Sequence, residues 1–410
     1  RCAAGGSVLR APQRAFTVSR KRRRRISGRS KRRVSAACLL CDAQSVGAGR
    51  PQLARGQSRL FVEAKPMSSY AFWNNKGGVG KSFLCFIAAC EYAQLHPEVD
   101  VVVLDLCPQA NTSEMLLGGQ LEGGKNLRKF LTPDASRLSV GGYLEHRLNS
   151  PFSQIPDAAR YTVKMKDHND KVSNNLYLVC GDNLVEVLGE AIRQTAQLSV
   201  PRDAWKKVTS WVRDLQDNIR ESRERDCVFF IDCNPSFAIY TQLAIAAADY
   251  IVIPFTADES SRRGIENIIA LLYGQGDEYI ASFARLSFYK RAKEEGLSLP
   301  KLHTFVSNRV TLFDGEPSKA HQAANKAIVN TLQALATKHR SIFAYPKIAV
   351  ADRFVDFPDF HAVSVVLALT GTPIHALKAG PKNLNGERVQ VNVGPLKLYK
   401  DSLTKLMEFL

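Results

Sequence analysis

Tyr70-Ala-Phe-Trp-Asn-Asn-Lys-Gly-Gly-Val-Gly-Lys-Ser82 is the segment of this 410-residue chain that points most directly to its architecture. It runs from an apolar stretch typical of a buried strand, through a glycine-rich turn, into a helical pattern that begins near Ser82. Glycines let the backbone curl so that successive N–H groups point at one phosphate, and the N-terminus of the following helix adds a favourable dipole. The segment therefore predicts a phosphate-binding loop between a strand and a helix.

The residue types at the end of this loop suit ATP and a magnesium ion. Lys81 supplies a point charge to the β- and γ-phosphates, and the Ser82 hydroxyl is a suitable ligand for Mg²⁺. We therefore expect a bound phosphate group with Mg²⁺. The predicted nucleotide contacts from the loop are Lys76, Gly77, Gly78, Val79, Gly80, Lys81, Ser82 and Phe83.

From Met67 onward, short apolar runs alternate with helical patterns, which is typical of a doubly wound α/β fold: a mostly parallel sheet with helices on both faces. The expected strands are 69–74, 100–105, 175–180, 226–232, 249–254, 302–307 and 343–348. The expected helices are 81–95, 183–197, 202–223, 237–247, 260–273, 317–338 and 359–370. Residues 115–170 have weak periodicity and several Gly, Pro and Asn residues, so we expect helix fragments and loops there.

Lys76-Gly-Gly-Val-Gly-Lys-Ser82 resembles the deviant Walker A motif of the ParA/MinD family of P-loop ATPases and is most similar to ParA-type partition ATPases. In that family, the first lysine reaches across an ATP-sandwich dimer to the partner's phosphates. The resemblance covers about residues 68–376 in the family's order. It includes Asp105-Leu-Cys-Pro-Gln-Ala-Asn111, Cys227-Val-Phe-Phe-Ile-Asp-Cys-Asn-Pro-Ser236, Ala246-Ala-Ala-Asp-Tyr-Ile-Val-Ile-Pro254, Val306-Ser-Asn-Arg309, Asp359-Phe-His-Ala and Gly371-Thr-Pro-Ile374.

The resemblance implies roles for residues in these motifs. The implied magnesium site is Ser82 with the strand-end carboxylates Asp105 and Asp232, although each aspartate alone could simply cap a strand end. Asn308 is the implied adenine contact, and a structural turn residue is the alternative. The implied catalytic set is Lys76, Lys81, Asp105 and Asn111.

The motif departs from the family at Cys107, where the switch usually has an aspartate that orients the attacking water. A thiol near its usual pKa cannot replace that carboxylate well. Two interpretations follow: a slow ATPase in which Asn111 or backbone groups hold the water, or an ATP-dependent dimer that has nearly lost hydrolysis. A redox-sensitive Cys107 is a third.

The basic character belongs to the N-terminal segment. The net charge is +17, but residues 1–66 hold 17 lysines and arginines and two acidic residues, which leaves 39 basic and 37 acidic residues for the rest. We expect a disordered basic extension over 1–66, which is a transit peptide, a basic nucleic-acid-binding arm or translation from upstream of Met67. A ParA-like domain over 67–378 and a tail over 379–410, which ends in an amphipathic helix, follow it. The pair Cys38-x-x-Cys41 lacks the further ligands of a metal site. Nine cysteines, several in apolar runs, indicate a reducing, cytoplasmic compartment, or an organelle if the extension is a transit peptide.

The resemblance implies a homodimer with ATP, a ParB-like stimulating partner, non-specific DNA as a possible ligand, and plasmid or chromosome partition or cargo positioning as the function. Candidate DNA contacts are Arg262, Arg263, Arg285, Lys290, Arg291 and Lys293. A MinD-like membrane role is the first alternative, because the tail places Leu396, Tyr399, Leu403, Leu406, Met407 and Leu410 on one helical face. The second alternative is an ATP-dependent metabolic enzyme, such as an amidotransferase, on the same scaffold.

Overall fold

The computed structural model describes residues 68–120, 122–132, 137–276, 278–279, 282–283, 288–313, 316–359 and 361–410. All of them fall within one compact unit, Leu60–Leu410. The expectations for residues 1–66, for the pair Cys38 and Cys41, and for Arg285 lie outside the described residues.

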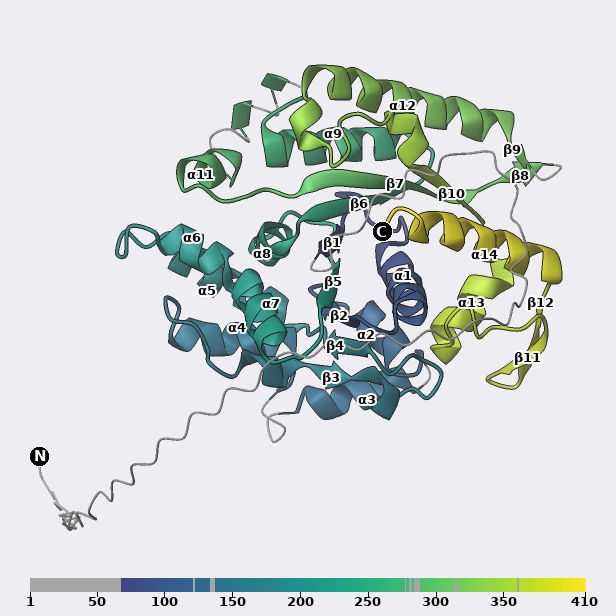
Figure 1. Ribbon diagram of the computed structural model, residues 1–410, viewed down its shortest axis with the longest axis horizontal. Coiled ribbons are helices and arrows are strands. Elements are labelled where there is room, and N and C mark those ends of the chain that lie inside the picture. The colour runs from purple at the N-terminus through teal and green to yellow at the C-terminus, as the bar shows by residue number, and fades with distance from the viewer. Residues whose placement is uncertain are drawn as a thin grey trace, which may run out of the picture. The chain divides into compact units, whose positions relative to one another are not determined.

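The centre of this unit is an eight-stranded sheet in the order β10-β7-β6-β1-β5-β2-β4-β3 (Figure 1). All neighbours pair in parallel except β3 and β4. The strands are β1 (Ser69–Phe72), β2 (Asp100–Asp105), β3 (Val163–Lys164), β4 (Leu176–Val179), β5 (Cys227–Asp232), β6 (Tyr250–Phe255), β7 (Lys301–Val310) and β10 (Phe354–Pro358). Strand β1 lies between β5 and β6, so the loop that follows it emerges in the middle of the sheet.

Strand residues alternate between two hydrophobic cores, one on each face of the sheet. Ala71 and Trp73 belong to one core, and Tyr70 and Phe72 to the other. Because a strand presents successive side chains to opposite faces, a run of apolar residues identifies a strand covered on both sides. This confirms the predicted doubly wound α/β class.

One face is covered by α4 (Val140–Asn149), α5 (Leu184–Ala196), α6 (Ala204–Thr209), α7 (Trp211–Glu221), α8 (Ile239–Ala247), α9 (Glu259–Tyr273), α11 (Phe288–Glu294) and α12 (Lys319–Lys338). The other face is covered by α1 (Lys81–Leu95), α2 (Asn111–Leu116), α3 (Gly123–Phe130), α13 (His361–Thr370) and α14 (Val393–Met407). Two hairpins form separate two-stranded sheets: β8 (Leu312–Phe313) with β9 (Glu316–Pro317), and β11 (Gly380–Leu384) with β12 (Glu387–Val391).

The C-terminal helix α14 packs its apolar stripe against the rest of the unit. Leu396, Tyr399, Leu403, Leu406 and Leu410 are buried, and Met407 is half-buried. The Tyr399 hydroxyl donates to the Pro358 carbonyl, and the α14 stripe belongs to the same core as α1. The face that suggested a membrane contact is therefore occupied by the protein itself. Among the residues that the structure describes, no helix combines the length and the apolar character needed to span a bilayer.

Two of the predicted elements were wrong. No strand forms over 343–348: Phe343 makes an isolated bridge to Leu302, and Pro346 has no N–H to continue a ladder. The strand at this edge of the sheet is β10, which the sequence did not predict. The helix expected over 202–223 is two helices, α6 and α7, divided at Ser210. Thr209 and Ser210 are weak helix formers because their hydroxyls compete for backbone groups.

Candidate nucleotide-binding site

The glycine-rich loop lies between the end of β1 and the start of α1, at the carboxyl edge of the parallel strands. Gly78 and Gly80 have φ values of 74° and 83°, a conformation that glycine adopts without strain. A Cβ on Gly80 would lie 2.3 Å from Nδ2 of Asn308, so this position also lacks room for a side chain. Both glycines thus let the backbone turn tightly, as a phosphate cradle at the N-terminus of α1 requires.

Lys81 is held inside the loop. The residue is 6% exposed, and its ammonium group donates to the Lys76 carbonyl at 3.0 Å. Burial lowers the pKa of Lys81, and the nearby Asp232 carboxylate opposes that shift. A buried ammonium with a single backbone acceptor has donors to spare, which suits contact with an anionic phosphate.

Asp232 ends β5 and is completely buried. Its Oδ2 accepts from the Thr112 hydroxyl at 2.7 Å, whereas Oδ1 has no hydrogen-bond partner among the described residues. Burial raises the pKa of Asp232, and hydrogen bonds from Ser82 and Thr112 offset part of that shift. An unpaired buried carboxylate oxygen is costly. A magnesium ion bound at the neighbouring Ser82 would satisfy it directly or through water, so these residues fit the expected cofactor.

Asp105 ends β2, also completely buried, and its oxygens are already engaged. Oδ1 accepts from the Cys107 N–H, and Oδ2 accepts from the N–H and the hydroxyl of Ser113. Burial and then the neighbouring Asp232 raise the pKa of Asp105 to about 7. In this arrangement Asp105 fixes the first turn of α2. This is a structural role of the kind that the sequence analysis gave as the alternative for each strand-end aspartate. Its roles in magnesium binding and catalysis stay predictions.

Cys107 lies beside these carboxylates and is 5% exposed. Burial, followed by Asp232 and Asp105, raises the pKa of its thiol to about 12. The raised pKa favours the neutral thiol near pH 7, which is a poor base and a poor nucleophile. Asn111, the first residue of α2, is half-buried and donates to the Gln109 side chain at 3.2 Å. Cys107 stands where the resemblance predicts a water-orienting aspartate.

Lys76 points away from its own loop, toward the start of α9. Its ammonium group lies 2.6 Å from Oδ2 of Asp258 and 3.0 Å from the Thr256 hydroxyl. The two side chains of the ion pair are 28% and 42% exposed. Burial alone would raise the pKa of Asp258, but hydrogen bonds from Lys76, Thr256 and the start of α9 hold it below its ordinary value. Lys76, the lysine that the resemblance expects to reach across a dimer, therefore forms an ion pair within its own chain.

The loop is tied to two other strands. Asn74 is buried, accepts from the Lys76 N–H through Oδ1 and donates to the Pro254 carbonyl through Nδ2. Asn308, at the end of β7, donates to the Val79 carbonyl at 2.9 Å. These two asparagines position the two ends of the loop relative to β6 and β7.

A cavity of about 610 Å³ opens beside Asn308 and is lined by Gly80, Phe83, Val365 and Leu369 among others. Its volume and its mixture of apolar and polar walls suit a nucleobase. Oδ1 of Asn308 is buried without a partner among the described residues, so it can accept from an exocyclic amine. The predicted adenine contact and the loop therefore lie on one continuous site.

Sequence reasoning missed Asn74, Thr112, Ser113 and Asp258. The pattern Asp258-x-x-Ser261 is a helix-start signal, and Asp258 does cap α9 by accepting from the Ser261 N–H. That signal predicts a cap but not its contact with Lys76. Thr112 and Ser113 carry no local signal because their partners are aspartates at the ends of two strands. Asn74 makes one local contact, with the Lys76 N–H, but its contact with Pro254 joins distant parts of the chain.

Comparisons with known proteins found similarity in sequence and in fold. A family model described as an AAA domain matches residues 67–275. A "ParA family protein" of Mycoplasma pneumoniae is 24% identical over 288 residues, which cover 68% of this chain and 88% of that protein. The ATP complex of a substituted Cyanothece McdA aligns over 84% of this chain and 98% of its own, with a TM-score of 0.51 and 13% identity. A putative plasmid partition protein of Borrelia burgdorferi bound to AMPPNP aligns over 84% of this chain and 100% of its own, with a TM-score of 0.47 and 15% identity.

The match to the AAA domain family spans just over half of the chain and includes the loop, both strand-end aspartates and Lys76 with its ion pair. The McdA structure shares the fold. The chain therefore belongs to the AAA domain family, as a P-loop ATPase of the ParA type.

Proposed function

We propose that this chain binds Mg-ATP at Lys76–Ser82, dimerises when ATP is bound, and hydrolyses ATP slowly in the partition or positioning of DNA or another cargo. The observation that carries the proposal is the completely buried Asp232, whose Oδ1 lacks a partner among the described residues and lies beside Lys81 and Ser82. The buried acceptor can bind a magnesium ion, and the buried ammonium beside it can bind the phosphate that the ion accompanies. Both groups lie at the end of the glycine-rich loop, where a metal-bound phosphate would supply the partners that they lack.

Each residue of the site has a separate task in this proposal. Backbone N–H groups of the loop bind the phosphates, Lys81 places its charge on the terminal ones, and Ser82 and Asp232 hold the magnesium ion. Bound magnesium neutralises charge that develops on the phosphates during transfer. Asn308 binds the adenine amine, and Thr112 orients Asp232.

The proposed slowness of hydrolysis rests on Cys107. Phosphoryl transfer depends mainly on positioning and electrostatics, and a neutral thiol orients water poorly. Asn111 is the nearest predicted substitute, and its amide is already paired with Gln109.

Cys107→Asp is expected to raise ATP turnover about tenfold to a hundredfold if a missing carboxylate limits the reaction. Phosphate release from purified protein under saturating Mg-ATP measures it. Cys107→Asn, of similar size and without charge, is the matched control and should leave turnover low. Equal rates for the aspartate and asparagine variants would mean that another group already holds the water.

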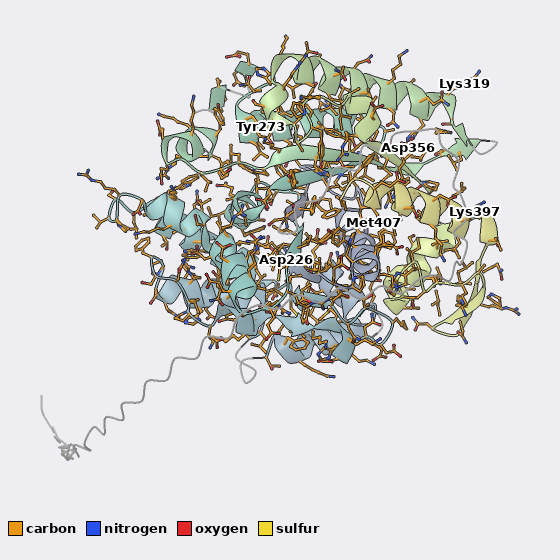
Figure 2. The ribbon with its side chains drawn as sticks, viewed as in Figure 1. Asp226, Tyr273, Lys319, Asp356, Lys397 and Met407 are labelled. Carbon is orange, nitrogen blue, oxygen red and sulfur yellow. The ribbon has the colours of Figure 1, made fainter. Side chains whose placement is uncertain are left out.

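Three of the five candidate DNA contacts that the structure describes form ion pairs within the protein. Arg262 forms ion pairs with Glu259 and Glu266, and Arg291 pairs with Glu295 while lying over Trp205. Lys290 lies 3.8 Å from Glu294. Helix α12 is a better candidate surface: its 20 residues include no acid, and it presents the exposed lysines Lys319, Lys326 and Lys338 (Figure 2, which labels Lys319).

Sizing of the protein with and without Mg-ATP, followed by binding to duplex DNA of arbitrary sequence, tests the proposed role. We expect an ATP-dependent dimer whose DNA affinity falls roughly 40-fold between about 50 and 200 mM salt, for three phosphate contacts. Lys319→Glu/Lys326→Glu should weaken DNA binding without affecting the dimer. Lys129→Glu/Lys164→Glu, at the β3 end of the sheet, is the charge-matched control. If the dimers do not bind DNA at low salt, the DNA part of the proposal is wrong, and a protein remains as the proposed cargo.

The alternative functions have less support. A membrane role would need the α14 stripe, which is buried against the protein. An amidotransferase would need a nucleophilic cysteine, but the cysteines that the structure describes are all buried. Burial raises the thiol pKa of the two that flank the site, Cys107 and Cys233.

A further inference from the structure

A second cavity, of about 580 Å³, lies between α4, the α6–α7 pair and the end of α11. Figure 1 shows α4, α6 and α11 together on the side of the unit away from α13 and α14. Arg147, Arg202, Lys206, Ser210 and the ring of Phe152 are among its walls. No residue of the Lys76–Ser82 loop lines it, so it is distinct from the nucleotide site.

The wall of this cavity includes an arginine that is almost fully buried. Arg147 is 2% exposed. Its Nη1 donates to Asp214 at 2.7 Å and to the Tyr143 hydroxyl at 3.2 Å, and the guanidinium lies over the Trp211 ring. Its Nε is buried without a partner among the described residues, and both hydrogen bonds described for the side chain come from Nη1. A buried guanidinium nitrogen without an acceptor is costly, so Arg147 is incompletely satisfied at Nε.

The charges around the cavity leave an excess of cations. Of the acidic residues in its walls, Asp214 pairs with Arg147, Asp203 pairs with Lys207, and Glu295 accepts from the backbone N–H of Lys206. The exposed side chains of Arg202 and Lys206 have no acidic partner in the part of the chain that the structure describes. Two unpaired cations therefore line the cavity together with Arg147, whose Nε has no partner among the described residues.

We propose that this cavity binds a phosphorylated small molecule with an apolar portion. Arg147, Arg202 and Lys206 would receive the phosphate, because guanidinium groups match its oxygens in pairs and an ammonium adds a compact charge. The Phe152 ring supplies an apolar wall for the remainder of the ligand. A volume of about 580 Å³ is ordinary for a small-molecule site.

Calorimetric titration with phenyl phosphate, with the nucleotide loop saturated by Mg-ADP, tests this proposal. Phenyl phosphate should bind with one site per chain. Phenol, which lacks the negative charge, and benzoate, whose carboxylate has two oxygens instead of three, should each bind at least tenfold more weakly. Equal binding of phenol or benzoate would overturn the phosphate assignment.

The matched variants locate the binding. Arg202→Glu/Lys206→Glu changes two exposed side chains, so folding should be unaffected, and it should weaken phenyl phosphate roughly tenfold or more. Lys397→Glu/Lys405→Glu makes the same charge change on α14 and should have no effect (Figure 2 labels Lys397). Equal effects of the two variants would overturn the site. Phenyl phosphate should also bind the Lys81→Ala protein without nucleotide, so the result does not depend on the proposed ATPase function.

Discussion

Lys81→Ala is expected to abolish ATP binding, with a loss of affinity of about a hundredfold or more. The Lys81 ammonium is buried at the foot of the loop, donates only to the Lys76 carbonyl among the described residues, and lies beside Asp232. Its removal leaves the β- and γ-phosphates facing two buried carboxylates, Asp105 and Asp232, without the intervening positive charge. Charge-assisted contacts to phosphate contribute most of the affinity of such a loop. Titration with a fluorescent ATP analogue in the presence of Mg²⁺ measures the effect.

Two controls make this result specific. Lys338→Ala removes an exposed lysine on α12 and should leave ATP affinity unchanged. Thermal unfolding without nucleotide should show that Lys81→Ala is no less stable than the parent, because burial of the ammonium already disfavours its charged form. Normal ATP binding by a folded Lys81→Ala protein would remove the assignment of this loop as the nucleotide site.

The fold was predictable where the signal was local. The strands around β1, β2 and β5 are continuous apolar runs, and their pattern alone indicates burial on both faces. Helix α1 was predicted with its observed bounds because the glycine turn ends at Gly80 and an unbroken helical pattern follows. The edge of the sheet was not predictable in this way. The choice between 343–348 and β10 depends on which segment reaches β7, and that is a contact between distant parts of the chain.

The same distinction separates the parts of the site. The loop residues follow one another in sequence, so their pattern identified them. The contacts that make the loop a site join residues far apart: Thr112 and Asp232 are 120 positions apart, Lys76 and Asp258 are 182, and Val79 and Asn308 are 229. Composition and periodicity carry no information about such pairs. The role of Asp105 shows the same limit, because its strand-end position was readable from the sequence, but its bond from Cys107 and its two bonds from Ser113 in α2 were not.

Lys76→Ala is expected to keep ATP affinity within about threefold of the parent and to lose the ATP-dependent dimer. The Lys76 ammonium makes no described contact with its own phosphate cradle and is held by Asp258 and Thr256 at the start of α9. The pair is partly exposed, and exposed ion pairs contribute only about 0 to 1 kcal/mol to stability. The lysine can therefore leave Asp258 at little cost when a partner's phosphate becomes available. Light scattering with Mg-ATP measures the dimer, and the fluorescent analogue measures affinity.

Loss of the dimer in Lys76→Ala could also follow from a disturbed α9, and Asp258→Asn separates the two causes. Asparagine caps a helix about as well as aspartate, so α9 should still begin normally while the ion pair with Lys76 is lost. If Lys76 acts across the interface, Asp258→Asn keeps the dimer, because the lysine and its charge remain and are released from their own chain. If the ion pair serves only to hold α9 in place, both variants lose the dimer together. Dimerisation of Lys76→Ala at the parent's ATP concentration would show that neither role limits assembly.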